Sequence, residues 1–363
     1  MSWRETTLGE ITDLKRGFDL PKSQRLQGDV PVYSSSGITG SNSTAAVEGP
    51  CVITGRYGTI GEVFFSGGPC WPLNTALYST EFNGNNPRFV YYLLQTIPWQ
   101  GYTTASAVPG VNRNHVNLCP VKIPDKATQD AIVEVLDSIV DKIALNNRLN
   151  DYLANLCETI ASRYCNDRNS RLRDICYQVA DHVDYDNANQ ETYVSTESLM
   201  QNKGGRQLAS SLPTTGKITR YKAGDTLISN IRPYFKKIWY APFEGTCSGD
   251  VIVFRANDPS NAPYLHACLR QDSFFDYVMQ GAKGTKMPRG DKKQMMEFKV
   301  ASSCSTKDLI LLDSAIKQRS DNDSETVKLQ ALRDTLLPKL MSGEIDVSKV
   351  DLTQLTNNHL ADC

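Results

Sequence analysis

A glycine-rich segment with an arginine and a tyrosine at its centre is the sharpest candidate for chemistry in this 363-residue chain. It reads Gly55-Arg56-Tyr57-Gly58-Thr59-Ile60-Gly61 and lies between two short apolar runs. Glycines supply the positive φ angles of a tight hairpin, so a hairpin accounts for them. From the tip of such a hairpin, Arg56 and Tyr57 can also reach a phosphate or the edge of a guanine. The residues alone leave these two interpretations equally open.

Polar side chains in other predicted loops extend this candidate nucleic-acid site. Hydroxyl, amide and guanidinium groups can contact bases or phosphates, although for any single one the better interpretation is that it satisfies its own turn. The candidates in the first half of the chain are Ser35, Ser36, Asn74, Arg113 and Asn114. In the second half, the place that matches Arg56 holds Asn230, Arg232, Tyr234 and Lys236.

A basic cluster adds a third group of candidates. The net charge of the chain is −1, which argues weakly against a nucleic-acid partner. Lysine and arginine nevertheless outnumber aspartate and glutamate between Arg220 and Lys299. A solvated face is the usual explanation of such a cluster, and a phosphate-binding patch is the alternative. Its candidate contact residues are Lys286, Arg289, Lys292 and Lys293.

No complete catalytic or metal-binding motif accompanies these residues. The chain lacks both a phosphate-binding Gly-x-x-x-x-Gly-Lys loop and a Gly-x-Ser-x-Gly nucleophile turn. Asn230-Ile231-Arg232-Pro233-Tyr234 only half resembles the loop with which an amino-group methyltransferase holds its base. The four histidines are scattered and predict no metal cluster. We therefore predict no catalytic residue, no metal and no cofactor bound by this chain itself.

Composition favours an intracellular protein. The ten cysteines form no Cys-x-x-Cys pair, so we expect free, mostly buried thiols in a reducing cytoplasm. The first residues lack the pattern of a signal peptide, and no run of eighteen apolar residues predicts a membrane span.

The elements that position the candidate residues occur twice. Leu136-Asp137-Ser138 recurs 176 residues later as Leu312-Asp313-Ser314. The segment 49–54 has a counterpart at 224–229, and the residues at 8–11 have one at 172–175. A repeat this long predicts two copies of one large unit rather than a solenoid.

Each copy ends in a long predicted helix. In the first helix, positions on one face follow alternating steps of four and three, which is a 3.5-residue period. Those positions are Ile132, Leu136, Ile139, Ile143, Asn146, Asn150, Leu153, Cys157, Ile160 and Tyr164. The second helix, from about 306 to 341, has apolar ends and a polar middle, for which we favour helix over loop. Because each helix needs a partner along its length, the simplest prediction is that the two pair with each other in antiparallel orientation.

The predicted fold is α+β, with two mixed α/β domains separated by two long antiparallel coiled-coil helices and an internal pseudo-two-fold repeat. Expected strands in the first domain are 51–54, 62–65, 76–79 and 116–123, with a short helix at 89–94. The predicted boundaries are 1–124 and 166–304 for the domains, 125–165 and 305–345 for the helices, and 346–363 for a flexible tail.

These features resemble the specificity subunits of type I restriction–modification enzymes. The most specific part is Leu336-Leu337-Pro338-Lys339-Leu340-Met341-Ser342-Gly343-Glu344-Ile345-Asp346-Val347, which looks like the end of the family's second conserved helix. The segment around Arg56, followed by Trp71-Pro72-Leu73-Asn74-Thr75-Ala76, looks like the centre of its target recognition domain. The second domain keeps neither motif, so its contact residues are less well defined.

The resemblance implies a subunit without chemistry of its own. Each recognition domain would read one half of a bipartite, asymmetric site in double-stranded DNA, and the helices would set the spacer. Two methyltransferase subunits carrying S-adenosylmethionine would dock on it, and restriction subunits using ATP and magnesium would join them. The alternatives from other classes are a stand-alone enzyme on an unfamiliar scaffold and a coiled-coil adaptor that binds only protein.

Overall fold

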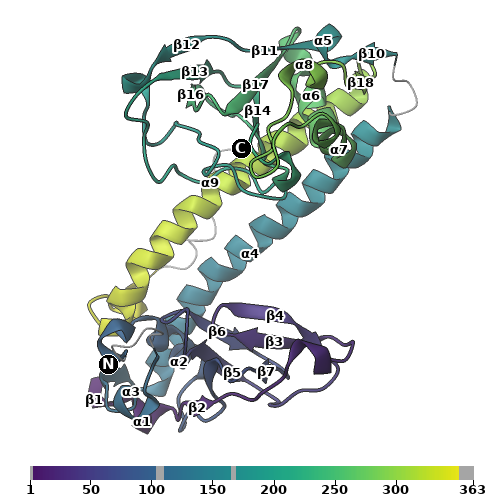
Figure 1. Cartoon of the computed structure of the whole chain (residues 1–363). Helices are drawn as coiled ribbons and strands as arrows, with labels where there is room; N and C mark the ends of the chain where they lie inside the picture. Colours follow the sequence, from purple (N-terminus) through teal and green to yellow (C-terminus); the bar gives the residue numbers. More distant parts are fainter. Residues whose placement is uncertain (1–2, 104–109, 165–168, 351–363) are drawn as a thin grey trace. The chain divides into compact units, whose positions relative to one another are not determined.

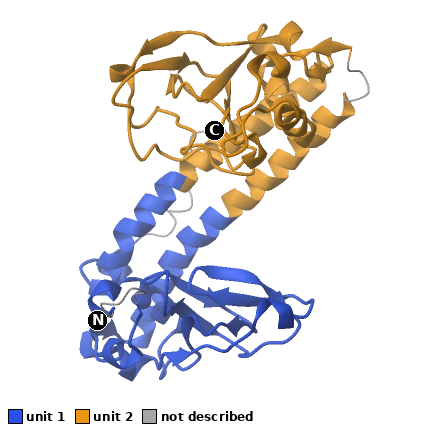
Figure 2. Cartoon of the chain, viewed as in Figure 1, with its two compact units in different colours: residues 1–144, 327–363 blue, residues 145–326 orange. Residues whose placement is uncertain are grey.

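The computed structural model describes residues 3–103, 110–164 and 169–350. The chain forms two compact units, coloured separately in Figure 2: unit 1 comprises residues 1–144 and 327–363, and unit 2 comprises residues 145–326. Each unit therefore contains one globular part and one segment of each long helix.

The globular part of unit 1 is built from three small sheets. The first sheet joins the two ends of the globular part, because β1 (Trp3–Thr7) pairs with β9 (Pro120–Pro124). The second has the order β2-β8-β5-β6, from Lys15–Arg16, Ala76–Ser79, Cys51–Gly55 and Val63–Ser66. The third has the order β4-β3-β7, from Gly37–Asn42, Val30–Ser34 and Trp71–Pro72. The helices beside them are α1 (Leu8–Ile11), α2 (Pro87–Gln95) and α3 (Arg113–Val116), with single 3-10 turns η1 (Lys22–Gln24) and η2 (Trp99–Tyr102).

Unit 2 repeats this set of sheets. Its paired ends are β10 (Ser170–Arg171) and β18 (Lys299–Val300). The four-stranded sheet has the order β11-β17-β14-β15, from Cys176–Gln178, Val251–Ala256, Thr226–Ser229 and Ile238–Tyr240. The three-stranded sheet has the order β12-β13-β16, from His182–Asp184, Lys217–Tyr221 and Gly245–Cys247. The helical elements are α5 (Leu172–Ile175), α6 (Ala262–Leu269), α7 (Asp272–Gln280), α8 (Lys292–Met295), η3 (Tyr185–Asn187), η4 (Pro233–Phe235) and η5 (Pro259–Asn261).

The matching order of the two four-stranded sheets confirms the predicted internal repeat and the α+β fold class. The three-stranded sheets differ, because β3 pairs in parallel with β7 whereas β13 pairs antiparallel with β16. The short helices α1 and α5 also occupy the two segments that the sequence comparison matched, 8–11 and 172–175. The expected strands at 51–54, 62–65 and 76–79 correspond to β5, β6 and β8, and the helix at 89–94 lies within α2.

The expected strand at 116–123 is wrong in its first half. Asn112 caps α3 by accepting a hydrogen bond from the backbone N–H of Asn114, and this short helix ends at Val116. The strand begins only at Pro120, which is tolerated because it is the first residue of β9 in a two-stranded sheet.

Each unit buries one copy of the repeated Leu-Asp-Ser leucine. Leu136 is fully buried in the core of unit 1, where the end of the second long helix contributes Leu337, Leu340 and Met341. Leu312 is fully buried in the core of unit 2. Burying one leucine contributes roughly 1.5–3 kcal/mol, which explains why both copies of the repeat keep it.

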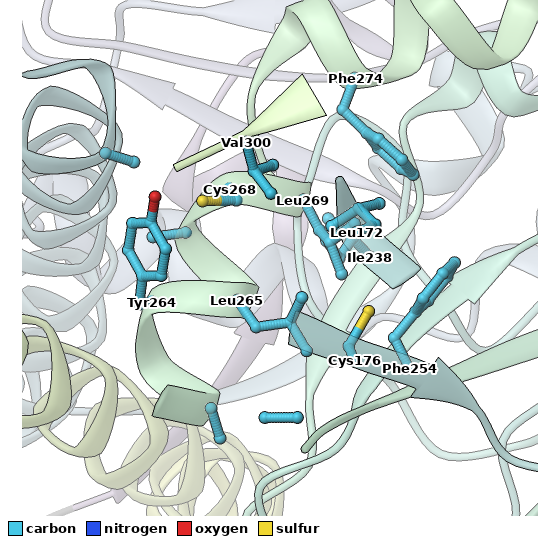
Figure 3. Close-up of a cluster of buried hydrophobic side chains, with 14 of the residues drawn as sticks. Leu172, Cys176, Ile238, Phe254, Tyr264, Leu265, Cys268, Leu269, Phe274 and Val300 are labelled. Atoms are coloured by element: carbon cyan, nitrogen blue, oxygen red, sulfur yellow. The ribbon is translucent and has the colours of Figure 1, made fainter. Parts of the chain in front are cut away.

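The core of unit 2 gathers side chains from several elements, as Figure 3 shows around α6. Tyr264 and Leu265 come from this helix, and Phe254 from the central β17. In Figure 3, the side chains of Leu172 and Cys176 approach from the start of the unit.

The two long helices are α4 (Lys126–Arg163) and α9 (Thr306–Ser342), both marked in Figure 1. Their antiparallel pairing is evident inside each unit. In unit 1, Ile139 and Ile143 of α4 pack with Leu329 of α9. In unit 2, Cys157 and Ile160 of α4 share a core with Leu312 and Ile316 of α9. The polar middle of α9 is helical, as favoured from the sequence.

Two asparagines lie on the predicted seam and are buried there, Asn146 at 2% and Asn150 at 8% exposure. The Asn146 amide donates to Glu325 at 2.8 Å. Asn150 donates to Asp323 at 2.7 Å and accepts from the Asn322 amide at 2.8 Å. These bonds satisfy the polar groups and fix the register of the helices, as a buried asparagine does in a coiled coil.

The chain continues beyond α9 with η6 (Val347–Lys349), and Val347 is buried against the unit 1 core. Residues 346–350 thus pack on the core, although the sequence suggested a flexible tail; the rest of that predicted tail, 351–363, lies outside the described residues. Eight described cysteines are free, seven of them buried, in agreement with the expected thiols.

Candidate nucleic-acid interface

In unit 1, the segment around Arg56 is held from both sides at the end of the central strand β5. The backbone N–H of Arg56 donates to the Thr75 carbonyl at 2.9 Å, and its own carbonyl accepts from Val111 N–H at 2.9 Å. Two glycines make this close packing possible. A Cβ at Gly55 would lie 1.7 Å from the Thr59 carbonyl oxygen, and one at Gly110 would lie 2.5 Å from the Tyr57 ring.

A pocket of about 560 Å³ opens beside this segment. Three arginines line it, Arg16, Arg56 and Arg113, together with Tyr57, and no carboxylate is among the described residues that line it. None of the three arginines forms an ion pair with another described residue. The pocket therefore presents uncompensated positive charge, which attracts anionic ligands such as phosphates.

Arg56 lies over its neighbour Tyr57, with its guanidinium carbon 4.7 Å from the ring centroid. Stacking leaves the in-plane N–H groups of a guanidinium free to bind a ligand, and Arg uses this fork to pair with phosphate or guanine. Tyr57 is 39% exposed, so its ring is also accessible. The structure thus brings the first two predicted site residues together, with Arg56 half-buried and Tyr57 exposed.

Arg113 and Asn114 form the first turn of α3, and both are exposed and line the same pocket. Arg16 was missed in the sequence because no motif marks it. It reaches the pocket because β2 pairs with β8, where Arg16 lies opposite Leu77. That pairing joins residues about 60 positions apart, which no local pattern encodes.

The remaining candidates of unit 1 lie outside the pocket lining. Ser35 and Ser36 form the turn between β3 and β4, and Ser36 bonds to the Ser34 hydroxyl at 3.1 Å. This turn approaches the glycine-rich segment, because a Cβ at Gly58 would lie 3.5 Å from the Ser35 hydroxyl. The Asn74 amide donates to Asp19, so its donor group is already engaged.

Unit 2 builds the same backbone frame with different side chains. The loop after β14 contacts the segment before α8, because Arg232 N–H donates to the Pro288 carbonyl at 2.8 Å and Ile231 pairs with Arg289. Asp291 caps α8 as Asn112 caps α3. This match places Lys292 and Lys293 at the positions of Arg113 and Asn114.

The basic residues next to α8 are largely available to a ligand. Lys286, Lys292 and Lys293 are exposed, and none forms an ion pair with another described residue. Arg289 forms an ion pair with Asp250 at 3.1 Å but is still 56% exposed.

The loop candidates of unit 2 differ in their availability. Tyr234 is 46% exposed beside Phe235. Asn230 is only 8% exposed, and its side-chain oxygen has no hydrogen-bond partner among the described residues. Lys236 forms an ion pair with Asp272 at 2.8 Å, so its charge is already compensated.

Comparison with known proteins agrees with this repeated architecture. A family model described as the type I restriction modification DNA specificity domain matches residues 1–155, which is the first globular part with most of α4. The type I restriction enzyme EcoDI specificity subunit of Escherichia coli is 19% identical, with 83% of this chain and 77% of that protein covered. Residues 1–155 thus resemble the type I specificity domain, and the similarity to the EcoDI subunit extends over most of the chain.

A solved structure shares the fold of this chain. The S subunit of the type I restriction–modification system from M. genitalium matches with a TM-score of 0.59 at 16% identity. The match covers 94% of this chain and 96% of that one, so it includes both units.

Other polar clusters in the described part of the chain have structural partners. Among the described residues, no group of three or more histidine, cysteine or carboxylate side chains is placed to hold a metal. His182 bonds to Thr219 at 3.2 Å, and Asp184 forms an ion pair with Lys217 at 2.8 Å. His266 is buried against Thr226, and burial lowers its pKa well below the usual value, which keeps it neutral. No described helix is long and apolar enough to span a bilayer.

Proposed function

We propose that this chain is a specificity subunit that reads a bipartite, asymmetric DNA site, with one half bound by each unit. The observation that carries the proposal is the shared backbone frame. In both units, the loop after the central strand packs against the segment before a short capped helix. In both units, exposed lysine or arginine side chains project from this frame.

The two units would use different chemistry on this frame. In unit 1, the stacked Arg56 and the nearby Arg16 and Arg113 suit a guanine edge or a phosphate. In unit 2, Lys286, Lys292 and Lys293 suit phosphates, because an ammonium group acts as a point charge without the planar fork of arginine. Different side chains on one frame are what two different half-sites require.

A second feature supports a protein partner on the long helices. On α4, four apolar side chains recur with steps of four, three and four, and all are at least 38% exposed. They are Leu145, Leu149, Tyr152 and Leu156, which we call the α4 stripe. An exposed apolar stripe with coiled-coil spacing suits a partner helix. We assign it to a methyltransferase subunit, because DNA carries negative charge rather than an apolar helix face.

The partners would supply the chemistry that this chain lacks. Two methyltransferase subunits would carry S-adenosylmethionine and modify one adenine in each half-site. Restriction subunits would use ATP and magnesium for translocation and cleavage. The long helices would fix the length of the unread spacer between the half-sites.

The test is to express this chain with its methyltransferase partner and to map the modified adenines across a genome. We expect one bipartite motif for the wild type. Replacing the stacked guanidinium, Arg56→Ala, should relax base preference in one half only, and Arg4→Ala, an exposed arginine away from the pocket lining, should leave both halves unchanged. Relaxation of both halves by the first variant would contradict the modular assignment.

Two outcomes would favour the other classes of function. Methyl transfer by the isolated chain with S-adenosylmethionine would identify it as an enzyme. A complex that protects no particular DNA sequence would leave only an adaptor role.

A further inference from the structure

A second loop of unit 2, residues 201–205, is packed against the loop that follows β14. The backbone N–H of Asn202 donates to the Phe235 carbonyl at 2.8 Å, and that of Lys203 donates to the Lys236 carbonyl at 2.9 Å. The two loops are far apart in the sequence, so this contact forms only when the unit folds. We call residues 201–205 the supporting loop and residues 230–237 the recognition loop.

Both loops contain residues in strained backbone conformations. Arg232 and Lys236 of the recognition loop have φ of 50°, and Asn202 and Lys203 of the supporting loop have φ of 54° and 61°. A side chain with a Cβ adopts this left-handed region at an energetic cost, and it persists there only where the surroundings hold it. The two loops therefore depend on contacts that fix them.

Ion pairs supply those contacts and connect both loops to α4. Asp272, in the first turn of α7, binds Lys236 at 2.8 Å and Lys203 at 3.1 Å. Lys203 also binds Glu158 of α4 at 3.0 Å. Arg270 completes the group by donating to the Lys203 carbonyl at 3.2 Å and approaching Glu158 at 3.5 Å.

Part of this group is buried, although the side chain of Asp272 itself is 61% exposed. The side chains of Arg270 and Lys203 are 5% and 11% exposed, so they are largely removed from water. Hydrogen bonds from Lys236 and then Lys203 lower the pKa of Asp272, which keeps its carboxylate charged. Removing one partner of such a group leaves a poorly solvated charge behind, which destabilises the arrangement.

We propose that Asp272 and Lys203 are positioning residues that hold the recognition loop in its DNA-reading conformation. This inference rests on the proposed function. It changes the role of Lys236, which becomes part of the support while Arg232 and Tyr234 face the DNA. It also connects the reading loop of unit 2 directly to the helix that we expect to carry the partner subunit.

The test uses the full chain in complex with its methyltransferase partner and compares Asp272→Asn with the wild type. The substitution keeps the shape of the side chain and removes its charge. We expect base discrimination in the second half-site to fall at least tenfold, while the first half-site and the slope of binding against salt concentration stay unchanged. Asp272→Glu should restore most of the discrimination. As a control, Asp258→Asn removes another carboxylate that caps a helical turn in the same unit and should have no effect.

A direct contact of Lys236 with DNA predicts a different result. If Lys236 contacts a phosphate, Asp272→Asn frees its charge, and binding becomes tighter and more salt-dependent with an unchanged motif. That outcome, or an unchanged motif and affinity, would overturn the inference. Failure of the proposed function is distinguishable, because the wild-type complex would then show no bipartite motif.

Loss of folding is separated by a second variant. Lys203→Met keeps the aliphatic stem and the backbone bond to Lys236 but removes the charge that binds Asp272 and Glu158. With thermal unfolding of unit 2 within a few degrees of the wild type, it should show the same selective loss in the second half-site. Retained discrimination in this folded variant would also refute the positioning role.

Discussion

Replacing Asn150 by alanine tests whether the polar centre of the helix pair stabilises unit 2. Asn150 is 8% exposed and accepts a hydrogen bond from the Asn322 amide at 2.8 Å. It also donates to Asp323 at 2.7 Å. The alanine variant removes both bonds, together with a longer bond to the Arg319 carbonyl at 3.5 Å, while leaving the partner groups on α9 in place.

The two lost bonds differ in cost. Asn322 is only 4% exposed, so its amide loses its partner without access to water, which costs about 1–3 kcal/mol. Asp323 lies at the exposed side of the helix and can be rehydrated, so its lost bond costs about 0.5–1.5 kcal/mol. We expect a total loss of roughly 2–4 kcal/mol, which is a change of about 30- to 700-fold in the opening equilibrium.

Hydrogen exchange of the α4 and α9 backbone amides measures this opening directly, and denaturant unfolding of the whole chain gives a second value. The double replacement Asn150→Leu and Asn322→Leu is the matched control, because two apolar groups leave no buried donor unpaired and should recover most of the stability. A single alanine variant within about 0.5 kcal/mol of the wild type would refute the reasoning, since it would mean that water reaches Asn322.

Two further predictions concern the proposed interfaces. If Lys292 and Lys293 both contact phosphates, replacing them by alanine should lower the slope of log affinity against log salt concentration by about 1.8, so that roughly tenfold less affinity is lost between 50 and 200 mM salt. The control Lys299→Ala in β18 should leave this slope unchanged. An unchanged slope for the double variant, measured by titration with DNA, would mean that the two lysines only face solvent. In the α4 stripe, Leu149→Asp should weaken co-purification of the methyltransferase subunit at least tenfold, because a charge at the centre of an apolar interface must be desolvated. The control Asn147→Asp, on the other side of α4, should leave co-purification unchanged. Equal binding of both variants would exclude the stripe as the docking surface.

The sequence predicted the helix pair well because its signal is local. The 3.5-residue period places one residue of each turn on the seam, and eight of the ten named seam positions are buried, the exceptions being Leu153 and Tyr164. Even the polar positions Asn146 and Asn150 follow the pattern. The same holds for the glycine-rich segment, because the close approach of Gly55 to the Thr59 carbonyl oxygen requires a residue without a Cβ.

The site could be predicted only in part because its contacts are long-range. Arg16 enters the pocket through a strand pairing, and Asn74 is engaged by Asp19, which is 55 residues away. Lys236 is neutralised by Asp272, 36 residues away. Residue type identifies a possible contact group, but only the fold decides whether that group is free to bind or already paired.

Under the proposed function, the two capped helices explain how one duplicated unit would read two targets. Asn112 and Asp291 perform the same backbone task, since each caps the helix that follows with a side-chain oxygen. The exposed residues after them carry no such duty, and they differ: Arg113 in unit 1 is replaced by Lys292 in unit 2. The frame is therefore set by local backbone demands that both copies share, whereas the reading side chains are free to diverge. Because arginine favours planar guanine or phosphate contacts and lysine favours phosphate charge, we expect the two half-sites to differ in how strongly base contacts, rather than phosphate contacts, determine binding.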